Sequence, residues 1–112
     1  MYPQVTYPEV DEALLSEMVR RLCEVGDPLR IVLFGSRARG QARADSDLDL
    51  PIIEESNLPR FKRSPRYLCA LIGLFPAKDV VVWTPDEVEE WSSVPNAFIT
   101  TALREGKTLY AR

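Results

Sequence analysis

The chain has 112 residues, of which 46% are hydrophobic and 28% charged, a balance typical of one globular domain with an ordinary core. Seventeen acidic and fourteen basic residues give a formal net charge of -3, which argues against general binding of long nucleic acids. Histidine is absent, so catalytic triads and zinc sites that depend on imidazole are excluded.

The cysteines and the hydropathy pattern bear on the cellular compartment. Cys23 and Cys69 stand apart, without a C-x-x-C motif, and are predicted to be buried free thiols in helices, as a reducing compartment allows. No run reaches the roughly 18 apolar residues of a membrane span, and the first residues lack the pattern of a signal peptide. We therefore expect a cytoplasmic protein with no membrane partner.

The first half of the chain predicts one helix and two strands. Apolar residues recur every three or four positions over residues 8–25, which indicates an amphipathic helix. Residues 30–34 form a short apolar, β-branched run typical of a fully buried strand. A second strand begins at 47–50, where aspartate alternates with leucine, and continues past Pro51. Because proline removes a backbone donor, we expect Pro51 to disturb the continuation and pairing of this strand.

The second half predicts three helices and two more strands. Serine followed by proline at 64–65 is typical of a helix N-cap with proline in the first turn. Thr84 and Glu87, three residues apart, form a capping box for another helix. In order, the expected elements are a helix that ends at Phe75, a strand at 78–83, a helix from Pro85, a helix at 96–105 and a strand at 107–110.

The turn after the first strand has the features of a phosphate-binding site. A strand that ends in Gly35–Ser36 and leads into a helical turn directs backbone N–H groups, a helix dipole and a hydroxyl toward one point. Gly35 permits close approach of a ligand, and Arg37 and Arg39 offer positive charge. Taken alone, the same residues are more commonly a plain turn with a capped helix.

A pair of aspartates marks the second strand. Asp47 and Asp49 are two residues apart, so the alternation of a strand places both carboxylates on one face and the intervening leucine on the other. Two neighbouring carboxylates repel each other, and a hard divalent cation such as Mg²⁺ would offset that charge through oxygen ligands. The alternative is an exposed strand face with two solvated aspartates.

Asp79 opens the valine-rich third strand and is the third acidic residue of interest. With Asp47 and Asp49 it would place three carboxylates on neighbouring strands beside the phosphate-binding turn. Such a set can hold two Mg²⁺ ions, one that lowers the pKa of an attacking hydroxyl and one that stabilises leaving pyrophosphate. The alternative for Asp79 is a solvated aspartate at a strand end.

Together these motifs resemble the nucleotidyltransferase superfamily of DNA polymerase β, and most closely its small prokaryotic MNT-type members. The resemblance rests on Gly35–Ser36, on Asp47–Asp49 and on Asp79, and it spans roughly residues 31–83. It implies a single minimal nucleotidyltransferase domain over residues 1–112, of the α/β (α+β) class. The implied polymerase-β-like palm has a mixed sheet of about four strands, with helices packed on one side.

The resemblance also implies ligands and a partner. MNT-type proteins are often antitoxins paired with a HEPN-family toxin, and some transfer AMP to a tyrosine of that partner. The implied function is Mg²⁺-dependent transfer of AMP from ATP to such a toxin, with which the chain would form an oligomer. The implied catalytic residues and ligands of two Mg²⁺ ions are Asp47, Asp49 and Asp79, and the implied nucleotide-binding residues are Gly35, Ser36, Arg37 and Arg39.

Two other functions stay open, namely an antitoxin that masks its partner without catalysis and a small-molecule nucleotidyltransferase of the aminoglycoside-modifying type. A palm of this length leaves no residues for a separate lid, so a protein partner that supplies its own hydroxyl fits better than a long nucleic acid. We expect Glu54–Glu55, which could serve a cationic antibiotic, to end a strand in solvent. We expect the basic cluster of Arg60, Lys62, Arg63 and Arg66 to be a solvated helix start.

Overall fold

The computed structural model describes residues 12–34, 48–74 and 78–112. In these ranges no helix is both long enough and apolar enough to cross a membrane. In chain order the elements are α1 (Glu12–Val25), β1 (Arg30–Leu33), β2 (Leu48–Ile53), the short 3₁₀-helix η1 (Arg60–Lys62), α2 (Pro65–Ala70), β3 (Lys78–Trp83), α3 (Pro85–Trp91), α4 (Phe98–Glu105) and β4 (Lys107–Ala111).

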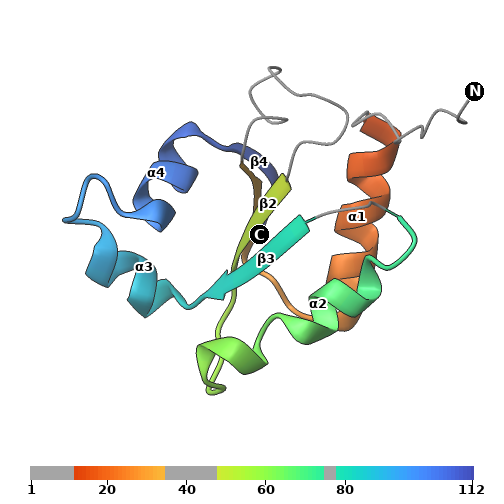
Figure 1. Ribbon diagram of the computed structural model, residues 1–112, viewed down its shortest axis with the longest axis horizontal. Coiled ribbons are helices and arrows are strands. Elements are labelled where there is room, and N and C mark those ends of the chain that lie inside the picture. The colour runs from red at the N-terminus through yellow and green to blue at the C-terminus, as the bar shows by residue number, and fades with distance from the viewer. Residues whose placement is uncertain (1–11, 35–47, 75–77) are drawn as a thin grey trace, which may run out of the picture.

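The four strands form one mixed sheet in the order β3-β2-β1-β4 (Figure 1). β2 and β3 run parallel, whereas β1 pairs antiparallel with both β2 and β4. A parallel pair needs a crossover connection, and the segment that contains η1 and α2 makes it. The mixed four-stranded sheet and its helices confirm the predicted fold class.

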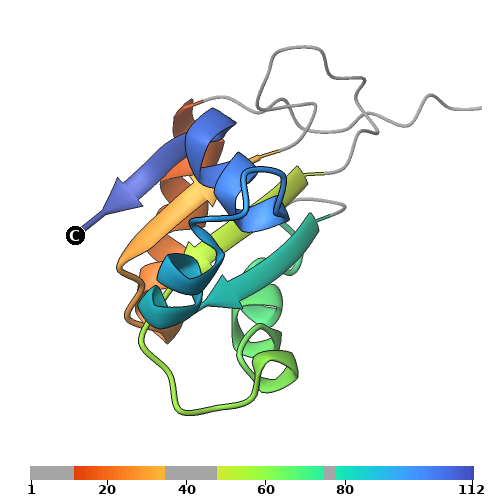
Figure 2. The ribbon, with the colours of Figure 1, turned by 90° about the vertical axis from the view of Figure 1, so that its left-hand side faces the viewer.

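Helices cover both faces of this sheet. α1 and α2 lie on one face, and α3 and α4 lie on the other (Figure 2). The expectation of helices on one side of the sheet is therefore wrong. Consecutive residues of β1, Ile31, Val32 and Leu33, are all buried. A strand that is buried on both of its faces needs helices on both sides of the sheet. The larger core, on the side of α1 and α2, contains Leu15, Met18, Leu22, Ile31, Leu33, Leu50, Ile52, Tyr67, Leu71, Val80 and Val82.

Pro51 interrupts the pairing of β2 with β1 but does not end the strand. The antiparallel ladder includes Arg30–Ile31 of β1 and resumes only at the bridge between Phe34 and Asp49, in the same register. Backbone N–H groups alternate in direction along a strand, and the N–H of Asp49 points toward β1. The nitrogen of Pro51, two residues later, therefore also points toward β1. Because proline has no backbone N–H, this position cannot donate a hydrogen bond to β1. On its other side β2 pairs with β3 without a break. The expected disturbance is therefore confined to one edge of β2.

α2 is shorter than its sequence pattern predicts. It ends at Ala70, not at Phe75, and turns follow to Gly73, whose φ of 81° is a left-handed conformation that favours glycine. Ile72, an apolar residue within the predicted helix, is 74% exposed. Ser64 is the N-cap of α2 and Pro65 opens the helix, as predicted, but Ser64 has helical backbone angles and its side chain makes no capping hydrogen bond.

Both cysteines are free thiols, as predicted, but only one is shielded from solvent. Cys23 in α1 is partly buried, and burial raises the pKa of its thiol. Cys69 in α2 is exposed, so the prediction of a buried thiol is wrong there.

The remaining predicted elements of the second half are confirmed. Thr84 and Glu87 form the expected capping box, in which each side chain accepts a hydrogen bond from the backbone N–H of the other, at 3.2 and 2.9 Å. β3 has the predicted bounds, whereas α4 begins two residues later than predicted and β4 ends one residue later.

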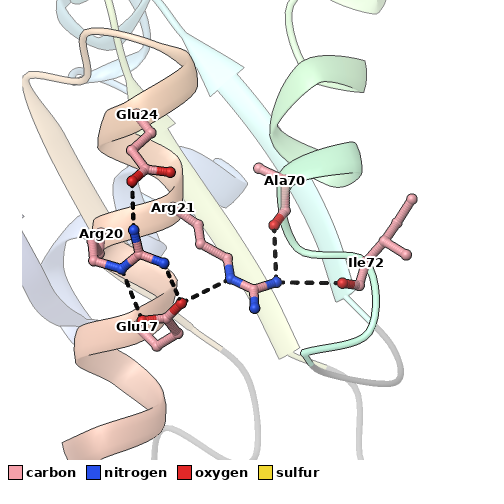
Figure 3. Close-up of polar contacts among 6 residues, drawn as sticks. All are labelled: Glu17, Arg20, Arg21, Glu24, Ala70 and Ile72. Carbon is pink, nitrogen blue, oxygen red and sulfur yellow. Dashed lines mark hydrogen bonds and ion pairs between the residues drawn. The ribbon is translucent and has the colours of Figure 1, made fainter.

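A charged cluster on α1 holds the end of α2 (Figure 3). The Arg21 guanidinium donates to the backbone carbonyls of Ala70 and Ile72, both at 3.4 Å, and to the Glu17 carboxylate at 3.0 Å. Glu17 also accepts two hydrogen bonds from Arg20, at 2.6 and 2.9 Å. The hydrogen bonds from Arg20 and Arg21 lower the pKa of Glu17 to about 2.

Glu17→Gln is expected to reduce the loss of stability in acid. Because the folded-state pKa of Glu17 is lowered from 4.5 to about 2, its contribution is present above pH 4.5 and is lost as the pH falls toward 2. Urea unfolding at a series of pH values should therefore show a shallower acid slope for Glu17→Gln than for the wild type. The exposed Glu55 offers a matched control, Glu55→Gln, and an equal slope for all three proteins would contradict the prediction.

Candidate functional site

Two of the predicted carboxylates lie side by side at one end of the sheet. Asp49, the second residue of β2, is the register partner of Asp79, the second residue of β3. Register partners on parallel strands project from the same face, with backbones about 4.8 Å apart. Leu50 and Val80, the next residues, are buried in the core against α1 and α2. Both aspartates therefore project on the opposite face, which carries α3 and α4.

Phe34 connects this aspartate pair to the residues that follow β1. Its backbone N–H donates to the Asp49 carbonyl and the Asp49 N–H donates to the Phe34 carbonyl, both at 2.9 Å. Gly35, the first residue of the predicted phosphate-binding turn, follows Phe34 directly in the sequence. The Phe34 ring also packs edge to face on Phe98 of α4, with centroids 5.6 Å apart. No sequence motif singles out Phe34, because its role depends on backbone hydrogen bonds.

Of the predicted site residues, the structure describes Asp49 and Asp79 and brings these two together. Asp49 is partly buried and Asp79 is exposed, so a ligand can approach the pair from solvent on one side. Both supply carboxylate oxygens, which are the ligands that Mg²⁺ prefers. The described ranges contain no cluster of three or more His, Cys, Asp or Glu residues that could hold a metal ion. The other predicted site residues lie outside the described residues: Gly35, Ser36, Arg37, Arg39 and Asp47.

The expectation of a solvated helix start is wrong for Arg63 of the basic cluster, whereas Arg60, Lys62 and Arg66 are exposed as expected. Arg63 is 8% exposed and donates to two backbone carbonyls, at 2.8 and 3.2 Å, and to the Glu87 carboxylate at 2.6 Å. Burial acts to raise the pKa of Glu87, but hydrogen bonds from the Thr84 backbone and from Arg63 lower that pKa overall. Arg60 stacks on the Trp83 ring, 4.1 Å from its centroid.

Glu54 is buried and not solvated, contrary to expectation, because three groups satisfy its carboxylate. It is 3% exposed, accepts hydrogen bonds from the Tyr67 hydroxyl at 2.6 Å and from the Asp27 N–H at 2.8 Å, and pairs with Arg66. Burial, followed by the contact with Glu54, raises the pKa of Tyr67. Glu54 follows the last residue of β2, so this network lies at the opposite end of the strand from Asp49.

Comparisons with known proteins agree with this geometry. Residues 15–105 match the family described as "Nucleotidyltransferase domain". Among solved structures, the crystal structure at 1.40 Å resolution of a candidate nucleotidyltransferase from Sulfolobus solfataricus is similar over 70% of this chain and 70% of its own, with 25% identity and a TM-score of 0.54. No curated protein matches the sequence at a significant level.

Proposed function

Since the chain belongs to the family of nucleotidyltransferase domains, we propose that it transfers AMP from ATP to a tyrosine hydroxyl of a cognate HEPN-type toxin, and thereby acts as the antitoxin. The observation that carries the catalytic part is the register pairing of Asp49 with Asp79 at the end of the sheet where Phe34 leads into Gly35. Nucleotidyl transfer is the activity of the family. The choice of ATP, the toxin as acceptor and the cytoplasm as location are our proposal.

In this proposal the carboxylates hold the metal and the turn holds the phosphates. Asp49 and Asp79 offer oxygen ligands from neighbouring strands, and Asp47 precedes Asp49 by two residues, the spacing that places both on one face of a strand. Bound Mg²⁺ supplies the positive charge that favours ionisation of an attacking hydroxyl and stabilises leaving pyrophosphate. The residues assigned to the phosphates are Gly35, Ser36, Arg37 and Arg39.

The proposed reaction moves AMP from ATP to the acceptor hydroxyl. The acceptor oxygen bonds to the α-phosphorus of ATP, and the bond between that phosphorus and the oxygen bridging to the β-phosphate breaks. Asp79 is exposed, so its carboxylate can receive the hydroxyl proton of an acceptor that arrives from solvent. Two backbone hydrogen bonds to Phe34 anchor the backbone of Asp49.

The charged surface favours a protein acceptor over a long nucleic acid. A polyanion requires free cationic side chains in a patch or stripe. Arg60, Arg63 and Arg66 are already engaged with an aromatic ring or a carboxylate of the same chain, and the formal net charge is -3. A protein partner that presents its own hydroxyl makes no such demand on this surface.

The burial of Glu54 disfavours the small-molecule alternative. In that alternative Glu54 and Glu55 would attract a cationic antibiotic. The Glu54 carboxylate is instead satisfied by Tyr67, Arg66 and the Asp27 N–H, at the end of β2 that lies away from Asp49. Only Glu55 is exposed.

The intact mass of the protein encoded beside this one tests partner and chemistry together. That protein would be co-expressed with the wild type and with the Asp47→Asn, Asp49→Asn double variant, and then purified and weighed. We expect additions of AMP only with the wild type. An unmodified partner that still co-purifies with both forms would instead support neutralisation by masking, and the proposed transfer would be wrong.

A further inference from the structure

Phe34 lies in one row with the two aspartates across three neighbouring strands. It is the bridge partner of Asp49 in an antiparallel pair, and Asp49 is the register partner of Asp79 in a parallel pair. Residues directly opposite each other in a sheet project from the same face. Leu33, the residue before Phe34, belongs to the core on the side of α1 and α2. Phe34 therefore projects toward α3 and α4, as the aspartates do.

A second aromatic ring, that of Phe98, adjoins this row. Phe98 is the first residue of α4, and its ring packs edge to face on Phe34, with centroids 5.6 Å apart and planes at 80°. Such a contact covers at most one face of the Phe98 ring. Phe98 is 41% exposed, so an aromatic surface stays accessible to a ligand beside the carboxylates.

The packing of α4 against β1 fixes the position of Phe98. At the end of the helix, the C-cap Gly106 approaches β1 so closely that a Cβ there would lie 2.5 Å from a methyl carbon of Val32. Near its start, the Thr100 hydroxyl donates to the Trp91 carbonyl at 2.8 Å. A side chain that is already held in place needs little further ordering when a ligand binds to it.

The distance and the chemistry of this surface fit the base of a nucleotide. The paired backbones of Phe34 and Asp49 are about 5.5 Å apart, and 5.6 Å separates the rings of Phe34 and Phe98. One nucleoside can span this separation when its phosphate lies at the aspartate pair. Residues 92–103 carry no charged side chain, so the surface around Phe98 suits the uncharged base and not the triphosphate.

We propose that the ring of Phe98 stacks on the base of the nucleotide whose phosphates and metal are held at the aspartate pair. This inference rests on the proposed function, because it assigns the base contact of the ATP that the function requires. Every base has a π face, so stacking supplies affinity with little preference among bases. The contact would orient the nucleoside while the carboxylates hold the metal.

Calorimetry of nucleotide binding in the presence of Mg²⁺ isolates the base contact. ATP is compared with ribose 5-triphosphate, which has the same phosphates and no base. We expect the wild type to bind ATP about tenfold more tightly than the base-free compound. Phe98→Leu keeps an apolar side chain against Phe34 but has no ring, so its two affinities should be nearly equal. Phe98→Tyr should restore the difference.

A second phenylalanine provides the matched control. Phe61 is 73% exposed and lies in η1, beyond the end of β2 that lies away from Asp49. Phe61→Leu should bind ATP and ribose 5-triphosphate as the wild type does. Circular dichroism checks the fold of Phe98→Leu, and the comparison of the two compounds on the wild type carries the test if that variant fails to fold.

The outcomes separate the base contact from the proposed transfer. Equal affinities of the wild type for the two compounds, or a preference for ATP that Phe98→Leu retains, would overturn the base contact. If Phe98→Leu raises the KM for the acceptor protein and leaves ATP binding unchanged, Phe98 contacts the acceptor and the proposed function survives without this base contact. A base preference that depends on Phe98, with no AMP transfer to the partner, would uphold the base contact and refute the transfer reaction.

Discussion

Asp49→Asn is expected to lower the rate of AMP transfer at least roughly a hundredfold while the fold stays intact. The change is isosteric and keeps the backbone groups that bond to Phe34, so β1 and β2 should pair as before. It removes one negative charge from the pair with Asp79 and thereby weakens the binding of a divalent cation. The rate is measured as transfer of label from ATP labelled in the α-phosphate to the partner protein.

A second aspartate supplies the control for this experiment. Asp27 is exposed, pairs with Arg112, and binds through its N–H to Glu54, at the end of β2 that lies away from Asp49. Asp27→Asn makes the same chemical change and should transfer AMP at the wild-type rate. A rate for Asp49→Asn within about threefold of the wild type would show that this carboxylate takes no part in the reaction.

Glu54→Ala is expected to lower the free energy of unfolding by about 2–4 kcal/mol, far more than the loss of an exposed charged side chain would. The substitution leaves the fully buried Tyr67 hydroxyl and the Asp27 N–H without their acceptor. The site is tightly packed as well, since a Cβ on Gly26 would lie 2.1 Å from the Tyr67 hydroxyl oxygen. Urea unfolding monitored by tryptophan fluorescence measures the loss.

Glu55, the residue next to Glu54, provides the control for this measurement. Glu55 is exposed, and Glu55→Ala should change the free energy of unfolding by less than about 0.5 kcal/mol. Glu54→Gln keeps an acceptor for Tyr67 and Asp27 and should cost less than Glu54→Ala. Similar losses for Glu54→Ala and Glu55→Ala would mean that the buried network does not stabilise the fold.

Strands and helix starts could be predicted because local chemistry determines them. The β-branched runs at β1 and β3 are too short and too apolar for surface helices, and the capping box at Thr84 fixes the start of α3. The end of α2 depends on tertiary contacts, since Arg21 of α1 binds the carbonyls of Ala70 and Ile72. A periodic pattern cannot show where such a contact intervenes.

The positions of the two aspartates could be predicted from the local sequence pattern, whereas the tertiary contacts of other charged residues could not. Period-two alternation and spacing single out Asp49 and Asp79, and the register of the parallel pair then brings them together. The internal partners of Arg63 and Glu54 could not be foreseen, because Glu87 and Tyr67 are distant in sequence and meet them only through the crossover of η1 and α2. Glu54 and Arg63, which seem solvated in the sequence, are part of the packing of this domain.

Binding of Mn²⁺, as a substitute for Mg²⁺, tests most directly whether Asp49 and Asp79 form one metal site. Electron paramagnetic resonance would follow protein-bound Mn²⁺ with ATP for the wild type, Asp49→Asn, Asp79→Asn and the double variant. If the two carboxylates share one site, each single substitution weakens Mn²⁺ binding and the double variant binds little more weakly than either. Effects that simply add, or affinities unchanged from the wild type, would contradict a shared metal site on β2 and β3.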